Sequence, residues 1–196
     1  MNIAIVKYNA GNTKSVENTL LRMGIQPMIT DDFEWLQKAD KVIFPGVGHA
    51  GTTMQYLKEK KLDEVIKNLQ QPVLGICLGQ QLMCAHSEEG NTDCLNIFPV
   101  NVKKFEANDA KNKIPQIGWN AINELKSPLF TDVVNNSFVY FVHSYYCEIS
   151  ENTIATTNYI QPFSAALQKN NFYAVQFHPE KSADIGAKII ENFINL

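Results

Sequence analysis

The sequence predicts an α/β fold: an open, mostly parallel sheet with helices on both faces and an antiparallel strand extension. Two observations support this prediction. In the first half, short apolar runs alternate with patterns of three- and four-residue spacing, as in parallel strands joined by helices. In the second half, the apolar runs are richer in aromatic and β-branched residues. Asn, Asp, Pro and Ser separate them, which is typical of strands joined by turns.

The first half contains four predicted strands, at residues 2–6, 25–30, 41–44 and 72–76. Proline cannot donate a hydrogen bond to a neighbouring strand, so Pro27 places the second strand at an edge of the sheet or at a strand start. Short connections between strand and helix signals favour a parallel sheet that is covered on both faces.

Three predicted helices follow the first, third and fourth strands. The first begins at a cap formed by Asn12 or Thr13 and ends at Gly24, because glycine adopts the left-handed conformation that stops a helix. The second covers about 52–70, in one or two pieces, and the third covers 78–86.

The second half is predicted to form strands, a hairpin and one last helix. The strand-like segments lie at 96–105, 114–122, 137–149 and 152–159, and the hairpin at 165–177 turns at the polar "KNN". A helix from Ser182 places apolar side chains on one face: Ile185, Ile189, Phe193 and Ile194.

Length and composition limit the class of protein. A chain of 196 residues suits one domain, so we expect a single domain over 1–196. The net charge of −3, without a basic stripe, argues against nucleic acid or a membrane surface as a partner. There is no secretion signal and no run of transmembrane length, so we expect a cytoplasmic protein.

Four cysteines are scattered along the chain without a C-x-x-C pair, so no zinc or redox motif is present and no metal site is expected. In a reducing compartment we expect no disulfides. Three of these cysteines are interpreted as small buried hydrophobic residues: Cys84, Cys94 and Cys147.

The loop "GVGHAG", from Gly46 to Gly51, matches the G-x-G-x-x-G pattern of dinucleotide sites. It follows the third predicted strand rather than the first, and Glu64, at the offset expected for a ribose-binding acid, lies in a charged helical stretch. We therefore expect no nucleotide and no other cofactor. The alternative use of such a loop is to present backbone N–H groups to a substrate oxygen.

Cys77 lies between a strand that ends at Ile76 and a helix that begins near Leu78. A sharp strand-to-helix turn of this kind exposes the nucleophile of G-x-S-x-G hydrolases above their sheet. Gly75 and Gly79 flank the thiol two residues away on each side, where a side chain would obstruct the turn. The positive end of a helix beside the sulfur favours the reactive thiolate. A buried core thiol is the alternative interpretation.

A thiol nucleophile needs a proton partner, and His178 is the best candidate among four histidines. It ends an apolar strand in "AVQFHPE", and Pro179 keeps its backbone extended. Residues two apart in an extended chain project to the same side, so Glu180 is expected to orient the imidazole. The predicted catalytic residues are therefore Cys77, His178 and Glu180, at the carboxyl ends of parallel strands.

The chain resembles the class I glutamine amidotransferases, which use a Cys-His-Glu triad. The resemblance spans nearly the full chain, and the family's motifs occur in the family's order: "PGVG" at 45–48, "GICLGQQL" at 75–82 and "QFHPEKS" at 176–182.

Two further strings are similar to the branch of this family that serves histidine biosynthesis: "YNAGNTKSV" from Tyr8 and "KIPQIGWN" from Lys113. The chain departs from the usual pattern of that branch at Lys7, Gln116 and Ile117.

The resemblance implies hydrolysis of L-glutamine to glutamate through a thioester on Cys77. It implies an oxyanion hole made by main-chain N–H groups of Gly46, Val47, Gly48 and Leu78. It also implies substrate contacts from Gln81, Glu89, His143, Ser144 and Tyr145, although Glu89 in "HSEEGN" could equally be an ordinary loop carboxylate.

The resemblance further implies a partner. Ammonia is a poor end product, so a separate synthase subunit is expected, and in the family it is a cyclase with a (β/α)₈ barrel that forms a heterodimer with the glutaminase. The "PGVG" segment is then mis-oriented until the partner binds. Family positions near that interface match Asn12, Trp119, His143 and Lys181, and a place in the core is the alternative for Trp119.

Three alternative functions stay open at this point. A stand-alone cysteine γ-glutamyl hydrolase would use the same triad without a partner. A paralogous amidotransferase would supply ammonia to a different synthase, for example in surface-sugar amidination. A non-catalytic interaction module is disfavoured because Cys77, His178 and Glu180 are all intact.

Overall fold

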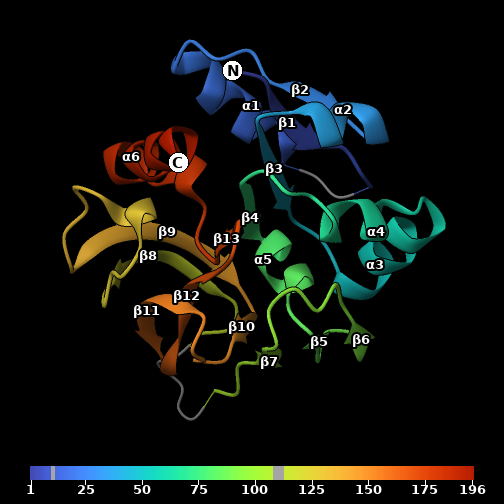
Figure 1. The fold of residues 1–196 in the computed structure, drawn as a ribbon. Coiled ribbons are helices and arrows are strands. Elements are labelled where there is room, and N and C mark those ends of the chain that lie inside the picture. Colours follow the sequence, from blue (N-terminus) through green and yellow to red (C-terminus); the bar gives the residue numbers. More distant parts are fainter. Residues whose placement is uncertain (10–11, 108–112) are drawn as a thin grey trace.

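The computed structural model describes residues 1–9, 12–107 and 113–196. The chain forms one large sheet with helices on both faces and a separate two-stranded hairpin (Figure 1). The elements of the first half are β1 (Ile3–Val6), α1 (Thr13–Arg22), β2 (Met28–Thr30), α2 (Phe33–Lys38), β3 (Lys41–Gly46), α3 (Ala50–Glu59), α4 (Leu62–Lys67), β4 (Val73–Cys77), α5 (Leu78–Met83), β5 (His86–Ser87) and β6 (Thr92–Asp93).

The second half is mainly strands, as the sequence predicts. Its elements are β7 (Asn101–Lys104), β8 (Gln116–Ile122), the 3₁₀ turn η1 (Pro128–Phe130), β9 (Ser137–His143), β10 (Tyr145–Cys147), β11 (Thr153–Tyr159), β12 (Gln161–Lys169), β13 (Phe172–Val175), the 3₁₀ turn η2 (Pro179–Lys181) and α6 (Ala183–Asn195).

The main sheet has the order β2-β1-β3-β4-β13-β12-β10-β7-β5-β6 within the described residues, with β11 paired to β12. The first five strands of this order are parallel, and β12, β10 and β7 continue the sheet in antiparallel pairing. The predicted α/β fold with an antiparallel extension is therefore confirmed. The strand that Pro27 precedes, β2, lies at the sheet edge, also as predicted.

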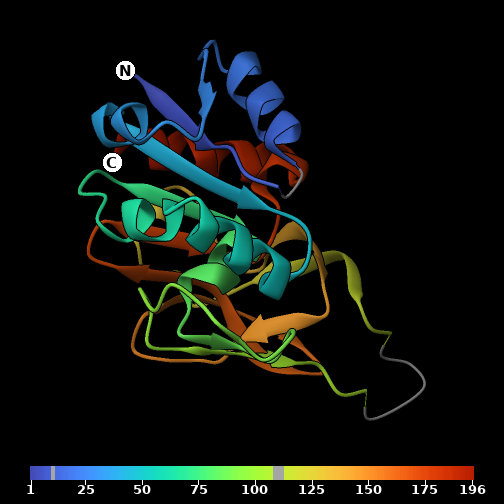
Figure 2. The same cartoon turned by 90° about the vertical axis from the view of Figure 1, so that its right-hand side faces the viewer.

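Two apolar cores lie on opposite faces of this sheet. One contains Val16 and Leu20 of α1, the apolar face of α6 and the inner face of the β8–β9 hairpin. The other contains Leu36 of α2 together with buried residues of α3, α4 and α5. Figure 1 shows α1 and α6 on one side of the sheet and α2, α3 and α4 on the other, and Figure 2 looks onto the face that α3 and α4 cover. No helix of the described part is long and apolar enough to cross a lipid bilayer.

Several local predictions were incomplete or wrong. The sequence analysis missed α2 and the short strands β5 and β6, and the helix expected over 78–86 ends at Met83. The segment 137–149 is not one strand. It changes sheet at Ser144, because β9 pairs with β8 while β10 pairs with β7 and β12.

The parallel strands bring the predicted site together. The last residues of β3 and β4 are paired, Gly46 with Cys77, and β13 lies directly beside β4. The carboxyl ends of three adjacent strands therefore meet at one edge, which is where α/β folds place their sites.

Candidate active site

Cys77 occupies a strained turn between β4 and α5. Its backbone has φ 54° and ψ −107°, a conformation that is rare for any residue except glycine. A Cβ on Gly79 would collide with the main-chain carbonyl of Phe44, and a Cβ on Gly75 would lie 2.9 Å from the Met83 sulfur. The two glycines therefore allow β3, β4 and α5 to pack closely around this turn, in agreement with the sequence prediction.

The Cys77 side chain is 6% exposed and has two polar neighbours. Nε2 of Gln176 lies 3.6 Å from Sγ and donates to it. Sγ lies 3.8 Å from the main-chain carbonyl oxygen of Val142, to which a neutral thiol can donate. The sulfur thus has one hydrogen-bond donor and one acceptor as neighbours.

His178 and Glu180 form a buried pair immediately after β13. Nδ1 of His178 donates to Oε1 of Glu180 over 2.8 Å, and both side chains are fully buried. The predicted contact is present, but the predicted reason was wrong. The backbone is extended only at His178, and Pro179–Lys181 then forms a 3₁₀ turn that brings the carboxylate back onto the ring.

The pKa of His178 is determined by competing effects. Burial lowers it, but the charge of a Cys77 thiolate and the Glu180 carboxylate outweigh burial and raise it to about 10. Nε2 makes no hydrogen bond of normal geometry among the described residues. The Cys77 sulfur and the Glu180 carboxylate therefore favour the imidazolium form of His178.

Asn12 contacts this pair directly. Its Nδ2 donates to Oε1 of Glu180 over 2.5 Å, across 168 residues of sequence. Its own backbone is left-handed, at φ 82°, and its side chain makes no cap hydrogen bond to α1. Asn12 therefore occupies the predicted N-cap position, but its side chain binds the carboxylate and does not cap the helix. Gly24, at φ 77°, ends the helix as predicted.

The Cys77 sulfur opens into a cleft of about 280 Å³. Most of the residues expected to hold glutamine or its oxyanion line this one cleft, and Pro115 and Val142 join them. The lining residues are Val47, Gly48, Cys77, Leu78, Gln81, Glu89, Pro115, Val142, His143, Ser144 and Tyr145. Gly46 is buried beside the cleft as the strand partner of Cys77.

Two expected substrate contacts are already engaged within the protein. Nε2 of Gln81 donates both to the Tyr145 carbonyl and to Oε1 of Gln176, each over 3.0 Å. Oε2 of Glu89 accepts from the N–H of Ala50 over 2.7 Å, at the start of α3. The oxygen of the Gln81 amide therefore remains for a ligand, and Glu89 is held in place by a helix end.

His143 is buried and uncharged. Nδ1 lies 2.7 Å from the Tyr145 carbonyl, and Nε2 lies 3.0 Å from Oε1 of Gln116. Burial lowers the pKa of His143 to about 4, against the hydrogen bond to Tyr145, which raises it, while the charge of His178 lowers it further. This histidine is therefore neutral near pH 7.

The sequence analysis missed Gln176 and the contact between Asn12 and Glu180. Gln176 stands two residues before His178, next to β13, so strand alternation was an available signal for it. No local signal predicts the Asn12 contact, because it joins the two ends of the chain.

Trp119 lies on β8 and is 52% exposed, so its interpretation as a core residue was wrong. Lys181 is exposed, and its Nζ lies 6.0 Å from the centre of the Tyr140 ring on β9. Trp119 and Tyr140 are strand partners in the β8–β9 hairpin. Two of the four expected interface residues, Trp119 and Lys181, therefore lie at the outer face of this hairpin, whereas Asn12 contacts Glu180 and His143 is buried.

The remaining cysteines are free thiols. Cys84 and Cys147 are buried, with their sulfurs 3.5 Å apart, as expected for small core residues. Cys94 is half-buried rather than buried, and burial raises its pKa to about 12. Within residues 1–9, 12–107 and 113–196, no three His, Cys, Asp or Glu side chains gather closely enough to hold a metal ion.

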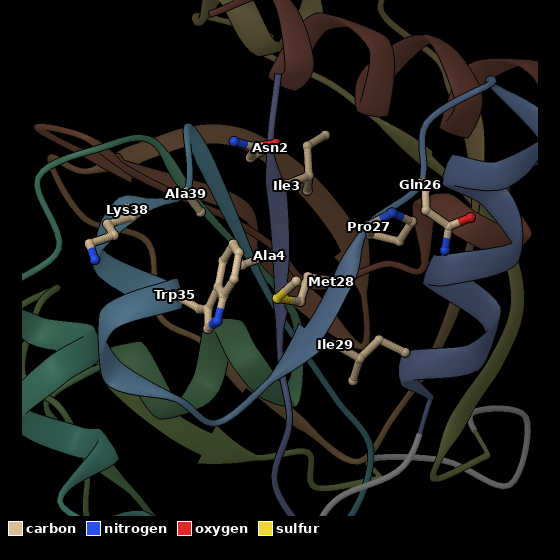
Figure 3. Close-up of a pocket in the computed structure, with 10 residues that line it drawn as sticks. All are labelled: Asn2, Ile3, Ala4, Gln26, Pro27, Met28, Ile29, Trp35, Lys38 and Ala39. Atoms are coloured by element: carbon tan, nitrogen blue, oxygen red, sulfur yellow. The ribbon is translucent and has the colours of Figure 1, made fainter.

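A larger cavity, of about 450 Å³, lies between β1, β2 and α2 (Figure 3). Trp35, Met28 and Pro27 are among its lining residues, and its lining contains no thiol, imidazole or carboxylate. The only charged side chain in the lining, Lys38, pairs with Glu34 over 3.0 Å. Size alone does not make it the chemical site, and the smaller cleft at Cys77 contains the reactive groups.

Comparisons with known proteins agree with this geometry. Residues 4–196 match the glutamine amidotransferase class-I family. The chain is 59% identical to the imidazole glycerol phosphate synthase subunit HisH of Bacteroides thetaiotaomicron, over 100% of both chains. It is 46% identical to the subunit of the same name from Haemophilus influenzae, over 99% of this chain and 97% of that one.

A solved glutamine amidotransferase shares the fold, with a TM-score of 0.74 at 15% identity, and the match covers 98% of this chain and 97% of that one. The family match extends over nearly the whole chain, and the relatives match it from end to end. This chain is a member of the class I glutamine amidotransferase family.

Proposed function

We propose that this chain is the glutaminase subunit of an imidazole glycerol phosphate synthase. It hydrolyses L-glutamine to glutamate and passes the ammonia to a cyclase subunit. The names of relatives at 46–59% identity over nearly full length support this assignment. The arrangement that supports it most directly is the Cys77 turn, which opens into a cleft beside the buried His178–Glu180 pair.

In this proposal the Cys77 thiolate attacks the side-chain amide carbon of glutamine, and the carbonyl oxygen becomes an oxyanion. The N–H of Leu78 and the N–H groups of the Gly46–Gly48 segment bind that oxyanion. Val47, Gly48 and Leu78 line the same cleft as the sulfur, which supports this role. Each such donor is typically worth about 3 kcal/mol in the transition state. The orientation of the loop therefore controls the rate.

His178 moves the protons. As imidazolium it protonates the departing nitrogen, so that ammonia leaves and the thioester remains on Cys77. The neutral imidazole then takes a proton from water, and the resulting hydroxide adds to the thioester carbon. Collapse of this second intermediate releases glutamate and regenerates the thiolate. Glu180 holds the ring in the required tautomer through Nδ1, over 2.8 Å.

The amino-acid end of glutamine is proposed to bind across the cleft from Cys77. The free oxygen of Gln81 and the carboxylate of Glu89 can accept hydrogen bonds from the substrate ammonium group. Ser144 and Tyr145 line the far wall beside the neutral His143. The positions of these side chains in one cleft support their assignment as substrate contacts.

We propose that the partner is a (β/α)₈-barrel cyclase, bound in a heterodimer over the outer face of the β8–β9 hairpin. That face exposes Ile117, Trp119 and Phe138, at 63%, 52% and 56%. Exposed apolar patches of this kind mark protein interfaces. Lys181 lies at the same face, beside Tyr140, and Asn12 lies next to the triad carboxylate.

We further propose that residues 1–196 form one amidotransferase domain and that it works in the cytoplasm. The family match over 4–196 supports the first statement. Four free thiols support the second, since free thiols are usual in a reducing compartment.

The test uses a diazoketone analogue of glutamine, incubated with the complex of this chain and its cyclase. We expect one covalent adduct per chain, located on Cys77 by peptide mass spectrometry, and protection by excess glutamine. Absence of labelling in a verified complex would contradict the proposed chemistry. Full glutamine turnover by the chain alone, unchanged by the cyclase, would instead indicate a stand-alone hydrolase.

A further inference from the structure

Gln176 is a fully buried polar residue that directly follows β13 and has no role in the proposed mechanism. It is 0% exposed and lies two positions before His178. Its Nε2 lies 3.6 Å from Sγ of Cys77. Sulfur is larger than oxygen and accepts hydrogen bonds at longer distances, so this contact places an amide donor against the nucleophile.

The orientation of this amide is fixed by its other end. Nε2 of Gln81 donates to Oε1 of Gln176 over 3.0 Å, so the NH₂ group of Gln176 must face the sulfur. Gln81 is held in turn by the main-chain carbonyl of Tyr145, over 3.0 Å. Gln81 and Gln176 are both buried, so the donor is in place before any substrate arrives.

The second polar neighbour of the sulfur makes this donor important. The carbonyl of Val142, 3.8 Å from Sγ, can accept from a neutral thiol but repels a thiolate. Ionisation of Cys77 therefore loses one contact and needs another. The Gln176 amide supplies it, because a hydrogen bond to the charged form of an acid favours that form.

Other ionisable groups also surround the sulfur. They lie in the segment after β1, in the loop after β5, on β9 and β10, and in the segment after β13. In that order they are Tyr8, Glu89, His143, Tyr145, His178 and Glu180. Only the imidazolium of His178 favours the thiolate by charge. Glu89 and Glu180 oppose it, and His143 is neutral. A buried neutral donor adds stabilisation without adding a second proton acceptor.

We propose that Gln176 is a catalytic residue that donates an N–H to the Cys77 sulfur and stabilises the thiolate, with Gln81 as the positioning residue for its amide. This inference rests on the proposed role of Cys77 as the nucleophile. The same donor improves the sulfur as a leaving group when the thioester is hydrolysed, because the thiolate is regenerated in that step.

The test measures the pH dependence of Cys77 alkylation by iodoacetamide in the full-length chain. The thiolate attacks the methylene carbon, a C–S bond forms and iodide leaves. The midpoint of the rate profile belongs to the coupled Cys77–His178 pair. Background labelling of the other cysteines is subtracted with a Cys77→Ala variant.

Two substitutions change the donor in different ways. Gln176→Met removes it at similar size. Gln176→Glu keeps an acceptor for Gln81 but places a carboxylate oxygen against the sulfur. The matched control is Gln80→Met, since Gln80 is equally buried and its amide donates to the Ser164 carbonyl over 3.1 Å rather than to Cys77.

We expect Gln176→Met to raise the alkylation midpoint by about one pH unit and Gln176→Glu to raise it further, while Gln80→Met leaves it unchanged. The loss of kcat/KM in Gln176→Met should reach about tenfold near neutral pH and vanish at high pH. If Gln176 had a purely structural role, the variant would have a lower kcat/KM than the wild type at every pH, and the difference would not vanish at high pH. If near-ultraviolet circular dichroism shows that Gln176→Met does not fold, the alkylation midpoint of Gln176→Glu tests the proposal instead.

An unchanged midpoint in the folded Gln176 variants, or an equal shift in Gln80→Met, would overturn the inference. Failure of the proposed function has a different signature: the Cys77→Ala variant would keep its glutaminase activity whatever the alkylation profiles show.

Discussion

At the residue scale, the buried Glu180 carboxylate is the most constrained charge in the site. One of its oxygens, Oε1, accepts from both His178 and Asn12. The other, Oε2, is buried without a hydrogen bond in the described part of the chain. Since a buried polar group is costly unless it is hydrogen-bonded, Asn12 supplies one of the two donors that stabilise the carboxylate beside the imidazole.

Replacing Asn12 should therefore alter catalysis from outside the triad. Asn12→Ala removes one of the two donors, and we expect kcat for glutamine to fall about tenfold. Asn12→Asp puts a second carboxylate beside Glu180 and should lower kcat further. Steady-state kinetics in the complex measures both variants. Ammonia-supported synthesis is the control for assembly. If its rate falls as much as the rate with glutamine, Asn12 acts only at the interface.

The buried neutral His143 makes a second residue-scale prediction, on stability. Its pKa is about 4 in the folded protein and near the ordinary value of 6.5 when unfolded. Between these values the unfolded chain binds more protons, so stability decreases as the pH falls. From pH 7 to pH 5 this residue should lower the free energy of unfolding by about 2 kcal/mol.

Urea unfolding at both pH values, in the wild type and in His143→Gln, checks this expectation. Between pH 7 and pH 5, the free energy of unfolding should fall by about 2 kcal/mol less in the variant than in the wild type. Equal losses in the two proteins would mean that His143 is not held neutral by the fold.

At the element scale, the junction of β4 and α5 determines where Cys77, the proposed nucleophile, lies. Cys77 is paired with Gly46 of β3 on one side and begins α5 on the other. Gly79, in the first turn of α5, rests directly on the Phe44 carbonyl of β3. The close packing of these three elements allows the backbone at Cys77 to stay in its strained conformation.

Gly79→Ala should therefore be strongly destabilising. The new Cβ meets a main-chain oxygen of a central strand, which cannot move cheaply, so we expect a loss of about 3 kcal/mol or a failure to fold. Gly24→Ala is the control, because Gly24 has space around it and only its left-handed φ of 77° matters. We expect that variant to lose about 1 kcal/mol. Thermal unfolding of both proteins distinguishes the two costs, and equal small losses would contradict the close packing.

Most elements could be predicted from the sequence, and the errors have physical causes. Hydrophobic period revealed the strands and helices of the parallel half. It could not show the change of sheet at Ser144, because pairing to β8 or to β7 is decided by residues far along the chain. The helix α2 was missed although Asp32 caps it through the N–H groups of Glu34 and Trp35. In six residues, the apolar period is too short to recognise.

In the candidate site, too, features formed by local sequence could be predicted, and contacts between distant segments could not. The motifs around Cys77 and His178 identified both residues, because local sequence forms each turn. The Glu180 contact was predicted from an extended chain, but a 3₁₀ turn makes it. The contact from Asn12 joins segments 168 residues apart, so no local pattern reveals it. Strand alternation could have singled out Gln176, but its contact with Cys77 depends on packing between segments 99 residues apart.

At the scale of the whole molecule, the outer face of the β8–β9 hairpin joins the cleft to the surface. Val142, on β9, lines the cleft with Cys77, and the same hairpin exposes Trp119 and Phe138 to solvent. A partner that covers this face would contact the strand whose carbonyl lies 3.8 Å from the nucleophile. Because one hairpin both lines the cleft and forms the exposed face, binding of a partner there can change the surroundings of the Cys77 sulfur.

The two tryptophans provide a matched test of this face. Trp119 and Trp35 are both 52% exposed, but Trp35 lies on α2, in the other core layer. We expect Trp119→Ala to weaken binding of the cyclase about tenfold and Trp35→Ala to leave it unchanged. Calorimetric titration with the cyclase measures both variants. Equal affinities for the two would show that the partner binds elsewhere.

The most direct test of the account is the Cys77→Ala variant in complex with the cyclase, assayed separately with glutamine and with ammonia as the nitrogen source. We expect that synthesis from glutamine is abolished while synthesis from ammonia continues at the wild-type rate. Retained synthesis from glutamine would contradict the role of Cys77 as the nucleophile. Equal loss with both nitrogen sources would mean that the residue serves folding or assembly and not the chemistry.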